Sequence, residues 1–223
     1  MSDRPALTTT EAYDLWARSY DAHDNPLVAQ SELPLAELTP VLSGKRVLEL
    51  GCGTGRLAPA ILAAGATEYV GVDGSSGMLE RARTLQDPRA RWLHAELTAL
   101  PPSLIDFDLV LLCLVLEHFE DPFSVLSAAA KALGPAGQLV ALELHAELAQ
   151  RGIGAHFEHQ GQTIRLASYP HEASELRTAC TQAGLTPTRT TDWFPDAHAV
   201  TRSPKLARYR GTPVLLELRA CRS

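Results

Sequence analysis

The sequence has no excess of basic residues, no closely spaced cysteine pair and no long hydrophobic run, and each absence excludes a class of protein. Lysine and arginine number 20 against 26 aspartates and glutamates, so the formal charge is −6 and a general nucleic-acid binder is excluded. The four cysteines form no C-x-x-C pair, which favours reduced thiols in a cytosol. The longest apolar run, Leu109 to Leu116, is too short to span a membrane. The polar N-terminus is typical of neither a secretory signal nor a transit peptide.

What is present is the composition of a globular protein. The chain has 223 residues, of which 45% are hydrophobic and 21% charged. A chain of this length buries enough surface to form a core without disulfides or metal. We therefore expect one cytoplasmic domain spanning residues 1–223.

Short β-rich runs alternate with helical stretches through the middle of the chain. The predicted strands are Lys45–Leu50, Glu68–Val72, Arg91–Ala95, Phe107–Leu114 and Gln138–Leu144. Helices are predicted from Gly55 to Ala64, after the capping residues Ser75 and Ser76, and from Asp121-Pro122 to Leu133. This alternation predicts a doubly wound parallel sheet with right-handed crossovers.

The two ends of the chain follow a different pattern. Two helices, Thr10–Tyr20 and Leu27–Leu42, are expected to cap the sheet. After the fifth strand we predict a hairpin within Ala155–Leu166 that turns near Gln160-Gly161, and a helix from Glu172 to Ala183. Two more strands are predicted at Leu185–Trp193 and Pro213–Leu218.

The densest chemical signal is a glycine-rich loop between a strand and a helix. It reads V-L-E-L-G-C-G-T-G and places Gly51, Gly53 and Gly55 where a ligand can approach the main chain closely. Backbone N–H groups at such a turn face a polar or anionic ligand. The G-x-G-x-G spacing differs from the G-x-G-x-x-G of dinucleotide sites, and no phosphate-binding G-x-x-x-x-G-K-[ST] motif exists.

A carboxylate stands at the end of the second predicted strand, in V-G-V-D-G-S-S. There, Asp73 is well placed to accept hydrogen bonds from both hydroxyls of a ribose. The alternative is a purely structural turn with an aspartate that caps the next helix. The joint placement of loop and carboxylate, one strand apart, favours the ligand site.

Together these segments resemble the class I S-adenosylmethionine-dependent methyltransferases. The resemblance covers VLELGCGTG, VGVDGSSGMLERAR, HAELTALP, FDLVLLCLVLEHFED and LGPAGQLVALELH. The opening EAYDLWARSYD is similar to the lid of small-molecule members akin to quinone C-methyltransferases. The resemblance implies a Rossmann-like, seven-stranded, mostly parallel sheet with an antiparallel last strand. It also implies a helical lid over 1–44, a cofactor-binding core over 45–145, and an acceptor-site insertion with the last strands over 146–223.

The resemblance further implies a role for each matching residue. The methionine part of the cofactor would lie against Glu49 and the loop residues Gly51, Cys52, Gly53 and Gly55, with its amino group near Cys113; the ribose would lie at Asp73 and Gly74, and the adenine at Met78, Glu96 and the Leu97 N–H. Tyr20 is the lid residue expected to reach the cofactor, and Tyr13 is the alternative. For either tyrosine, amphipathic helix packing is the competing explanation.

Methyl transfer from a sulfonium releases a neutral leaving group, so alignment of the acceptor supplies most of the acceleration. A general base adds about 10²–10⁴-fold where the acceptor loses a proton. His145 directly follows a predicted strand and is the first candidate, with His118 second; the alternative is that neither moves a proton. In H-F-E-H, the side chains of His156 and His159 would point to opposite faces of a strand, so we predict no metal site.

The favoured function is therefore methyl transfer from S-adenosylmethionine to a small-molecule acceptor, with neither nucleic acid nor a membrane as partner. One alternative is a nicotinamide-dependent oxidoreductase, which the glycine spacing disfavours. Another is a non-catalytic regulatory protein that binds S-adenosylmethionine. Protein acceptors, the accepting atom (oxygen, nitrogen, sulfur or carbon) and the oligomeric state, monomer or homodimer, stay open.

Overall fold

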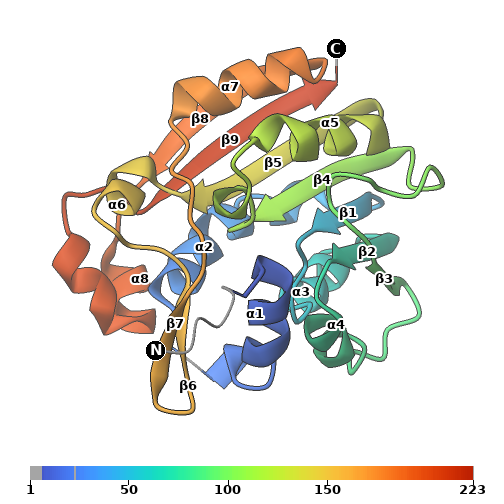
Figure 1. The fold of residues 1–223 in the computed structure, drawn as a ribbon. Coiled ribbons are helices and arrows are strands. Elements are labelled where there is room, and N and C mark those ends of the chain that lie inside the picture. Colours follow the sequence, from blue (N-terminus) through green and yellow to red (C-terminus); the bar gives the residue numbers. More distant parts are fainter. Residues whose placement is uncertain (1–6, 23, 223) are drawn as a thin grey trace.

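A seven-stranded sheet forms the centre of the computed structural model, which describes residues 7–22 and 24–222. Its strands are β1 (Arg46–Leu50), β2 (Glu68–Asp73), β3 (Ala90–His94), β4 (Phe107–Cys113), β5 (Leu133–Leu144), β8 (Leu185–Trp193) and β9 (Leu215–Arg222). The order is β3-β2-β1-β4-β5-β9-β8, and β9 runs antiparallel to both of its neighbours (Figure 1). The predicted fold class, including the antiparallel last strand, is confirmed.

Helices cover both faces of the sheet because the central strands are apolar on both sides. On one face, Leu48 and Val110 pack with α5 (Pro122–Ala132) and α7 (Ala173–Gln182). On the other, Val47 packs with α3 (Ala58–Ala63), while α4 (Ser76–Ala82) lies between β2 and β3 in the chain. Alternate residues of each strand thus enter different cores, as the two-residue period requires.

Several element boundaries differ from those predicted. The first helix, α1 (Thr9–Trp16), ends before a separate turn, η1 (Tyr20–Ala22). The second, α2 (Pro26–Ala36), ends before the turn η2 (Thr39–Val41), whose Pro40 cannot continue a helix. β5 begins at Leu133 rather than Gln138, because a register shift between Phe107 and Leu109 lets Leu133 pair with Phe107.

Two insertions lie beyond the carboxyl ends of the strands. The first holds α6 (Ala146–Gln150) and the predicted hairpin, β6 (His156–His159) and β7 (Gln162–Arg165). Its turn uses Gln160 and Gly161, both at positive φ. The second holds α8 (Ala197–Arg202) and the turn η4 (Pro204–Tyr209), which the sequence did not predict. Figure 1 shows α1 between the hairpin and α4, at this end of the sheet.

None of the helices in residues 7–22 and 24–222 has the length and apolar character needed to cross a bilayer.

Candidate active site

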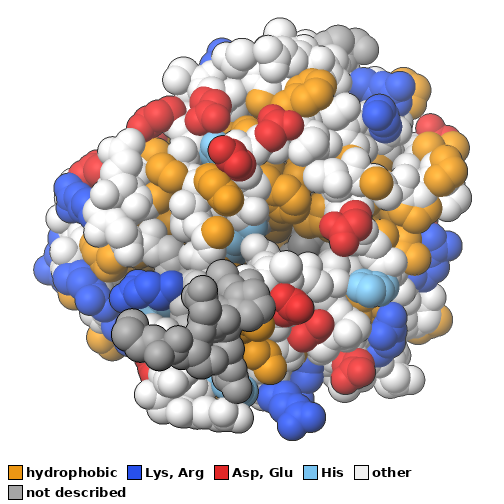
Figure 2. All heavy atoms as spheres, viewed as in Figure 1, with side chains coloured by type: hydrophobic (Ala, Val, Ile, Leu, Met, Phe, Trp, Pro, Cys, Tyr) orange, Lys and Arg blue, Asp and Glu red, His pale blue; other side chains and the backbone are white. Residues whose placement is uncertain are grey.

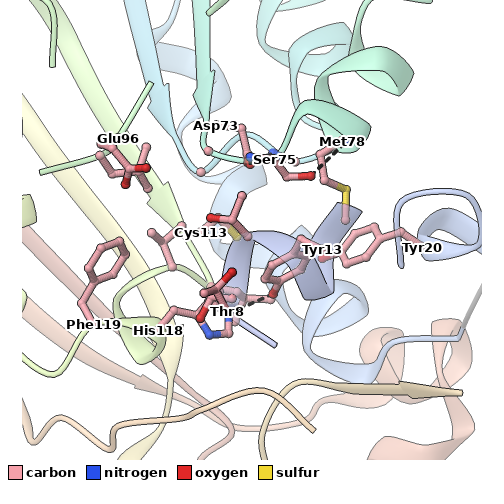
Figure 3. A pocket seen from close by; sticks show the side chains of 18 residues that line it. Thr8, Tyr13, Tyr20, Asp73, Ser75, Met78, Glu96, Cys113, His118 and Phe119 are labelled. Atoms are coloured by element: carbon pink, nitrogen blue, oxygen red, sulfur yellow. Dashed lines mark hydrogen bonds between the residues drawn. The ribbon is translucent and has the colours of Figure 1, made fainter. Parts of the chain in front are cut away.

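A cavity of about 330 Å³ opens where β1, β2 and β4 end, and α1 closes it from the opposite side. Most of the residues predicted to bind the cofactor line this cavity: Tyr20, Gly51, Gly53, Asp73, Gly74, Met78, Glu96, Leu97 and Cys113, together with Tyr13 and His118. Figure 3 shows the labelled members of this set around one space. The carboxyl edge of a doubly wound sheet is where such folds bind ligands.

The three glycines of the loop all have positive φ, but they differ in what surrounds them. A Cβ atom added at Gly51 would lie 2.5 Å from Val115 Cγ2, and one added at Gly55 would lie 2.4 Å from Trp92 Cη2. At Gly53 nothing lies within 4 Å. The first and third glycines therefore allow close internal packing, whereas Gly53 borders the open cavity.

Asp73 joins the glycine loop to the start of α4. Its Oδ2 accepts a hydrogen bond from the Gly53 N–H at 2.7 Å, and its Oδ1 accepts one from the Ser75 N–H at 2.8 Å. Burial raises the pKa of this carboxyl, although both backbone hydrogen bonds oppose the rise. A carboxylate oxygen accepts more than one hydrogen bond, so both oxygens keep capacity for a ligand that enters the cavity.

The α1 helix is fastened over the cavity by polar contacts. Asp14 Oδ1 accepts from Ser75 Oγ at 2.6 Å and from the Gly77 N–H at 2.8 Å, at the N-terminus of α4. After the helix, Asp21 Oδ1 accepts from Thr54 Oγ1 of the glycine loop at 2.8 Å. The predicted lid is thus tied directly to the loop and to the helix that border the cavity.

Tyr13 and His118 meet where the lid touches the end of β4. Tyr13 Oη lies 2.8 Å from His118 Nε2, as the dashed line in Figure 3 shows, and His118 Nδ1 lies 3.3 Å from the Ala167 carbonyl oxygen. A carbonyl oxygen only accepts, so we assign the imidazole proton to Nδ1. Nε2 then accepts a hydrogen bond from the Tyr13 hydroxyl, whose pKa burial raises well above its usual value.

His145, the first candidate base, lies outside this cavity. It is the N-cap of α6: its Nδ1 accepts from the Glu147 N–H at 3.2 Å, and its Nε2 lies 3.4 Å from Asp192 Oδ1. The chain turns into α6 as soon as β5 ends, so the imidazole caps that helix. The expectation that His145 overlooks the transferred methyl group is corrected, and His118 lines the cavity instead.

Three other predicted residues do not line the cavity. Glu49 is buried behind it, where its Oε2 accepts from the Tyr69 hydroxyl at 2.6 Å and burial raises its pKa to about 7. Cys52 is also buried, and Gly55 packs against Trp92. The structure thus places Glu49, Cys52 and Gly55 behind the wall of the cavity, where they support the loop, whereas the resemblance implied direct contacts with the cofactor.

A second cavity, of about 400 Å³, adjoins the first. The two share Tyr13, Tyr20 and Leu114 as lining residues. The rest of the second cavity is lined by Trp16, by residues 24–27, by Leu148 and residues 153–158, by Glu117, and by Lys205, Leu206, Arg208 and Tyr209 of η4. Figure 2, in the same view as Figure 1, shows a hollow near the centre of the molecule with hydrophobic side chains in it and acidic side chains nearby.

Glu117 is the buried carboxylate of the second cavity, and the sequence reasoning did not select it. It lies beside His118 in the short turn η3 (Leu116–His118), with 5% of its surface exposed. Its Oε2 accepts from Ser168 Oγ at 3.0 Å, and burial raises its pKa. The motif L-E-H contained a signal for it, since it places Glu117 directly before a candidate base in the turn that follows the fourth strand.

Glu143 holds the turn that carries Glu117 and His118. Its Oε2 accepts from the Val115 and Leu116 N–H groups, both at 2.9 Å, and burial raises its pKa to about 8. Its Oε1 is buried without a hydrogen-bond partner in the described residues. Glu143 thus fixes the cavity wall at the end of β4 from the neighbouring strand.

The raised pKa of Glu143 makes stability depend on pH. Between the unfolded pKa of 4.5 and about 8, the folded protein binds more protons than the unfolded chain, so the free energy of unfolding falls as pH rises. The slope is at most about 1.4 kcal/mol per pH unit. Denaturant unfolding at pH 5.5 and 7.5 measures how much the free energy of unfolding falls between the two pH values, and we expect a clearly smaller fall for Glu143→Gln than for the wild type. Some fall should remain in the variant, because the pKa of Glu49 is also raised. An equal fall in both proteins would contradict the assigned shift.

In the described part of the chain, no group of three or more histidine, cysteine, aspartate or glutamate side chains is arranged to hold a metal ion. His156 and His159 are the first and last residues of the four-residue strand β6, so their side chains point to opposite faces of it. His156 Nδ1 lies 2.9 Å from the Gly154 carbonyl oxygen.

Known proteins resemble this chain in sequence and in fold. The family model described as "Methyltransferase domain" matches residues 48–139. An uncharacterized methyltransferase of Emericella nidulans is 30% identical over 219 residues, covering 80% of this chain and 76% of that protein. A ubiquinone biosynthesis O-methyltransferase of Bordetella pertussis is 34% identical over 191 residues, covering 78% of each chain.

A solved structure has the same fold as this chain. An S-adenosylmethionine-dependent methyltransferase of Mesorhizobium loti superposes with a TM-score of 0.72 at 23% identity, covering 86% of this chain and 98% of that one. The predicted family, enzyme class and cofactor are thereby confirmed. The chain belongs to the class I S-adenosylmethionine-dependent methyltransferases.

Proposed function

We propose that this protein transfers the methyl group of S-adenosylmethionine to a small molecule held in the second cavity. The observation that carries the proposal is the pair of adjoining cavities, which share Tyr13, Tyr20 and Leu114. One contains the glycine loop and a carboxylate suited to a nucleoside, and the other has mainly aromatic and aliphatic walls. Residues 45–145 supply most of the lining of the first cavity, whereas residues 1–44 and 146–223 supply most of the lining of the second.

The residues of the first cavity fit the cofactor. Asp73 keeps acceptor capacity for the two ribose hydroxyls, and the space at Gly53 admits the methionine part. Met78 and Leu97 offer buried apolar surface to the adenine, with Glu96 and the Leu97 N–H facing its polar edge. When bound, the cofactor supplies an electrophilic methyl group on a sulfonium, and the protein aligns the acceptor with it.

Gly53→Val tests the cradle formed by the loop. The valine side chain would extend into the cavity, and a β-branched residue is strained at the φ of 55° found here. We expect loss of measurable S-adenosylmethionine binding in calorimetry. The matched variant Gly152→Val, also at positive φ with open space around it but outside both cavities, should keep wild-type affinity. Normal binding by Gly53→Val would make the loop a structural turn only.

The second cavity supports a compact acceptor with an apolar or aromatic body. Trp16 and Phe157 stack with ring centroids 4.9 Å apart and form part of its wall, and Leu148, Ile153 and Leu206 also line it. Two relatives support an acceptor of this kind: the Bordetella pertussis protein is named for ubiquinone biosynthesis, and a demethylmenaquinone methyltransferase of Clavibacter sepedonicus is 36% identical over 104 residues.

For an acceptor that loses a proton, the Tyr13–His118 pair supplies a route at the boundary between the cavities. Tyr13 Oη takes the acceptor's proton while the tyrosine's own proton moves to His118 Nε2, 2.8 Å away. The resulting imidazolium keeps its Nδ1–H toward the Ala167 carbonyl. His118 thus replaces His145 as the proposed base and acts through Tyr13. Glu117, in the same turn, is the alternative proton acceptor.

Cofactor binding distinguishes the candidate functions. S-adenosylhomocysteine should raise the melting temperature, and NAD should leave it unchanged. Stabilisation by NAD alone would support the oxidoreductase alternative. Stabilisation by S-adenosylhomocysteine without turnover of any acceptor in a broad panel would support the regulatory alternative.

A further inference from the structure

The buried carboxylate of Glu117 has no cationic partner in the second cavity. Among residues 7–22 and 24–222, its one side-chain hydrogen bond comes from Ser168 Oγ, and no lysine or arginine forms a salt bridge with it. Burial raises its pKa, while His118 and the Ser168 hydrogen bond oppose the rise. In the assigned hydrogen-bond pattern the His118 imidazole is neutral. A carboxylate withdrawn from water without a counter-ion is unfavourable, so the site favours a ligand that brings positive charge.

Aromatic rings line the same cavity, those of Tyr13, Trp16, Tyr20 and Phe157. Trp16 stacks with Phe157 at 4.9 Å and with Tyr13 at 5.7 Å between ring centroids. Tyr20 meets Trp16 edge-on at 5.0 Å. A ring face attracts a cation that lies within about 6 Å, and more strongly where water is excluded. A buried carboxylate and several rings in one cavity are the combination that binds a substituted ammonium group.

Glu117 lies close to the boundary between the two cavities. It directly precedes His118, which lines the cofactor cavity. Burial chiefly raises the pKa of Tyr13 and that of Tyr20, and the negative charge of Glu117 contributes to both rises. These two tyrosines line both cavities, and Figure 3 shows Tyr13 between His118 and Tyr20. A group bound at Glu117 is therefore held where the acceptor meets the cofactor.

The other charged side chains that line the second cavity are all exposed: Asp24, Glu158, Lys205 and Arg208. Lys205 pairs with Asp24, at 3.5 Å between Nζ and Oδ2. Water and salt screen such exposed charges, whereas a buried charge acts through a lower dielectric. Glu117 therefore sets the charge preference of the buried part of the cavity.

We propose that the acceptor is a primary or secondary amine, bound as its ammonium ion by Glu117 and the aromatic rings, and that the methyl group is transferred to its nitrogen. The inference rests on the proposed function and names the accepting atom. The competing explanation is a neutral hydroxyl or carbon acceptor, for which Glu117 only holds the Ser168 segment in place.

The transfer to nitrogen uses the proton route already described. The ammonium gives one proton to Tyr13 Oη while the tyrosine's own proton moves to His118 Nε2, 2.8 Å away. The freed lone pair of the nitrogen forms the bond to the methyl carbon as the bond from that carbon to sulfur breaks. The products are neutral S-adenosylhomocysteine and a methylated ammonium ion. Positive charge thus faces Glu117 before and after the reaction, and the carboxylate acts as its counter-ion.

A pair of ligands that differ in charge tests this role. Calorimetry at pH 7.5, on protein saturated with S-adenosylhomocysteine, would compare 2-phenylethylamine, which is a cation, with the neutral 2-phenylethanol. We expect the wild type to bind the amine at least about tenfold more tightly, and Glu117→Gln to reduce this preference to less than about threefold. Glu120→Gln is the matched control, since Glu120 is exposed, lines neither cavity and carries the same charge; its preference should equal that of the wild type.

Several results would overturn the proposal. They are failure of the wild type to bind the amine, equal binding of the two ligands, and an amine preference that Glu117→Gln leaves intact. If the glutamine variant does not fold, the wild type decides through the small molecule that it labels in a cell extract with a tritiated methyl group. A cation exchanger should retain that product at pH 7, and a product that passes through would overturn the proposal. Failure to bind S-adenosylhomocysteine, or to label any small molecule, would contradict the proposed function instead.

Discussion

Asp73→Ala is expected to weaken binding of S-adenosylmethionine at least about a hundredfold. The proposed contacts are two hydrogen bonds from ribose hydroxyls to a carboxylate, each worth about 1.5–3 kcal/mol. A loss of about 1.4 kcal/mol corresponds to a factor of ten in affinity. The substitution also frees the Gly53 and Ser75 N–H groups, so the loop that receives the cofactor loses its anchor. Calorimetric titration with S-adenosylhomocysteine measures the effect.

The matched control for this variant is Asp108→Ala. Asp108 Oδ2 also accepts a backbone hydrogen bond, from the Arg46 N–H at 2.8 Å, but at the opposite ends of β1 and β4. We expect Asp108→Ala to lower the melting temperature and to leave cofactor affinity unchanged. If the two variants bind the cofactor equally well, Asp73 has no contact with the ribose.

His118→Gln is expected to lower kcat by about 10²–10⁴-fold with an acceptor that loses a proton. Glutamine accepts the hydrogen bond from Tyr13 but cannot take up its proton, so the wall of the cavity stays in place while the proton route is lost. Affinity for S-adenosylmethionine should change little, which separates this effect from a binding defect.

His145→Gln is the control for His118→Gln, since His145 caps α6 and lines neither cavity. We expect it to retain kcat, with a stability change within about 1 kcal/mol. A slow His145→Gln beside an active His118→Gln would reverse the assignment. If Glu117→Gln is the slower variant, the proton goes to Glu117. Full activity of all three would leave alignment of the acceptor as the whole mechanism.

The sequence predicted the cofactor side of the site better than the acceptor side, for a physical reason. The glycine loop and Asp73 act through backbone turns and strand ends, which local sequence determines. The choice between His145 and His118 depends on which way a side chain turns after its strand. The start of α6 turns the His145 side chain toward that helix as its N-cap, and the sequence gives no separate signal for so short a helix.

The η4 segment shows a second limit of local sequence. Lys205, Arg208 and Tyr209 carry no motif, and they reach the second cavity only because the chain between β8 and β9 folds back over the carboxyl edge of the sheet.

Glu49 shows a third limit. The motif marks it as part of the loop, but the pairing of β1 with β2 brings Tyr69 to its carboxylate and places it behind the cavity.

The most direct test of the central claim follows the methyl group itself. The protein is incubated with S-adenosylmethionine labelled with tritium in the methyl group and with a whole-cell extract that has been separated into small molecules, proteins and nucleic acids. We expect label to accumulate on a small molecule, and the Asp73→Ala variant to transfer none. Two results would contradict the claim that the protein methylates a small molecule from a cofactor held by Asp73. One is label confined to protein or nucleic acid, and the other is transfer by Asp73→Ala at the wild-type level.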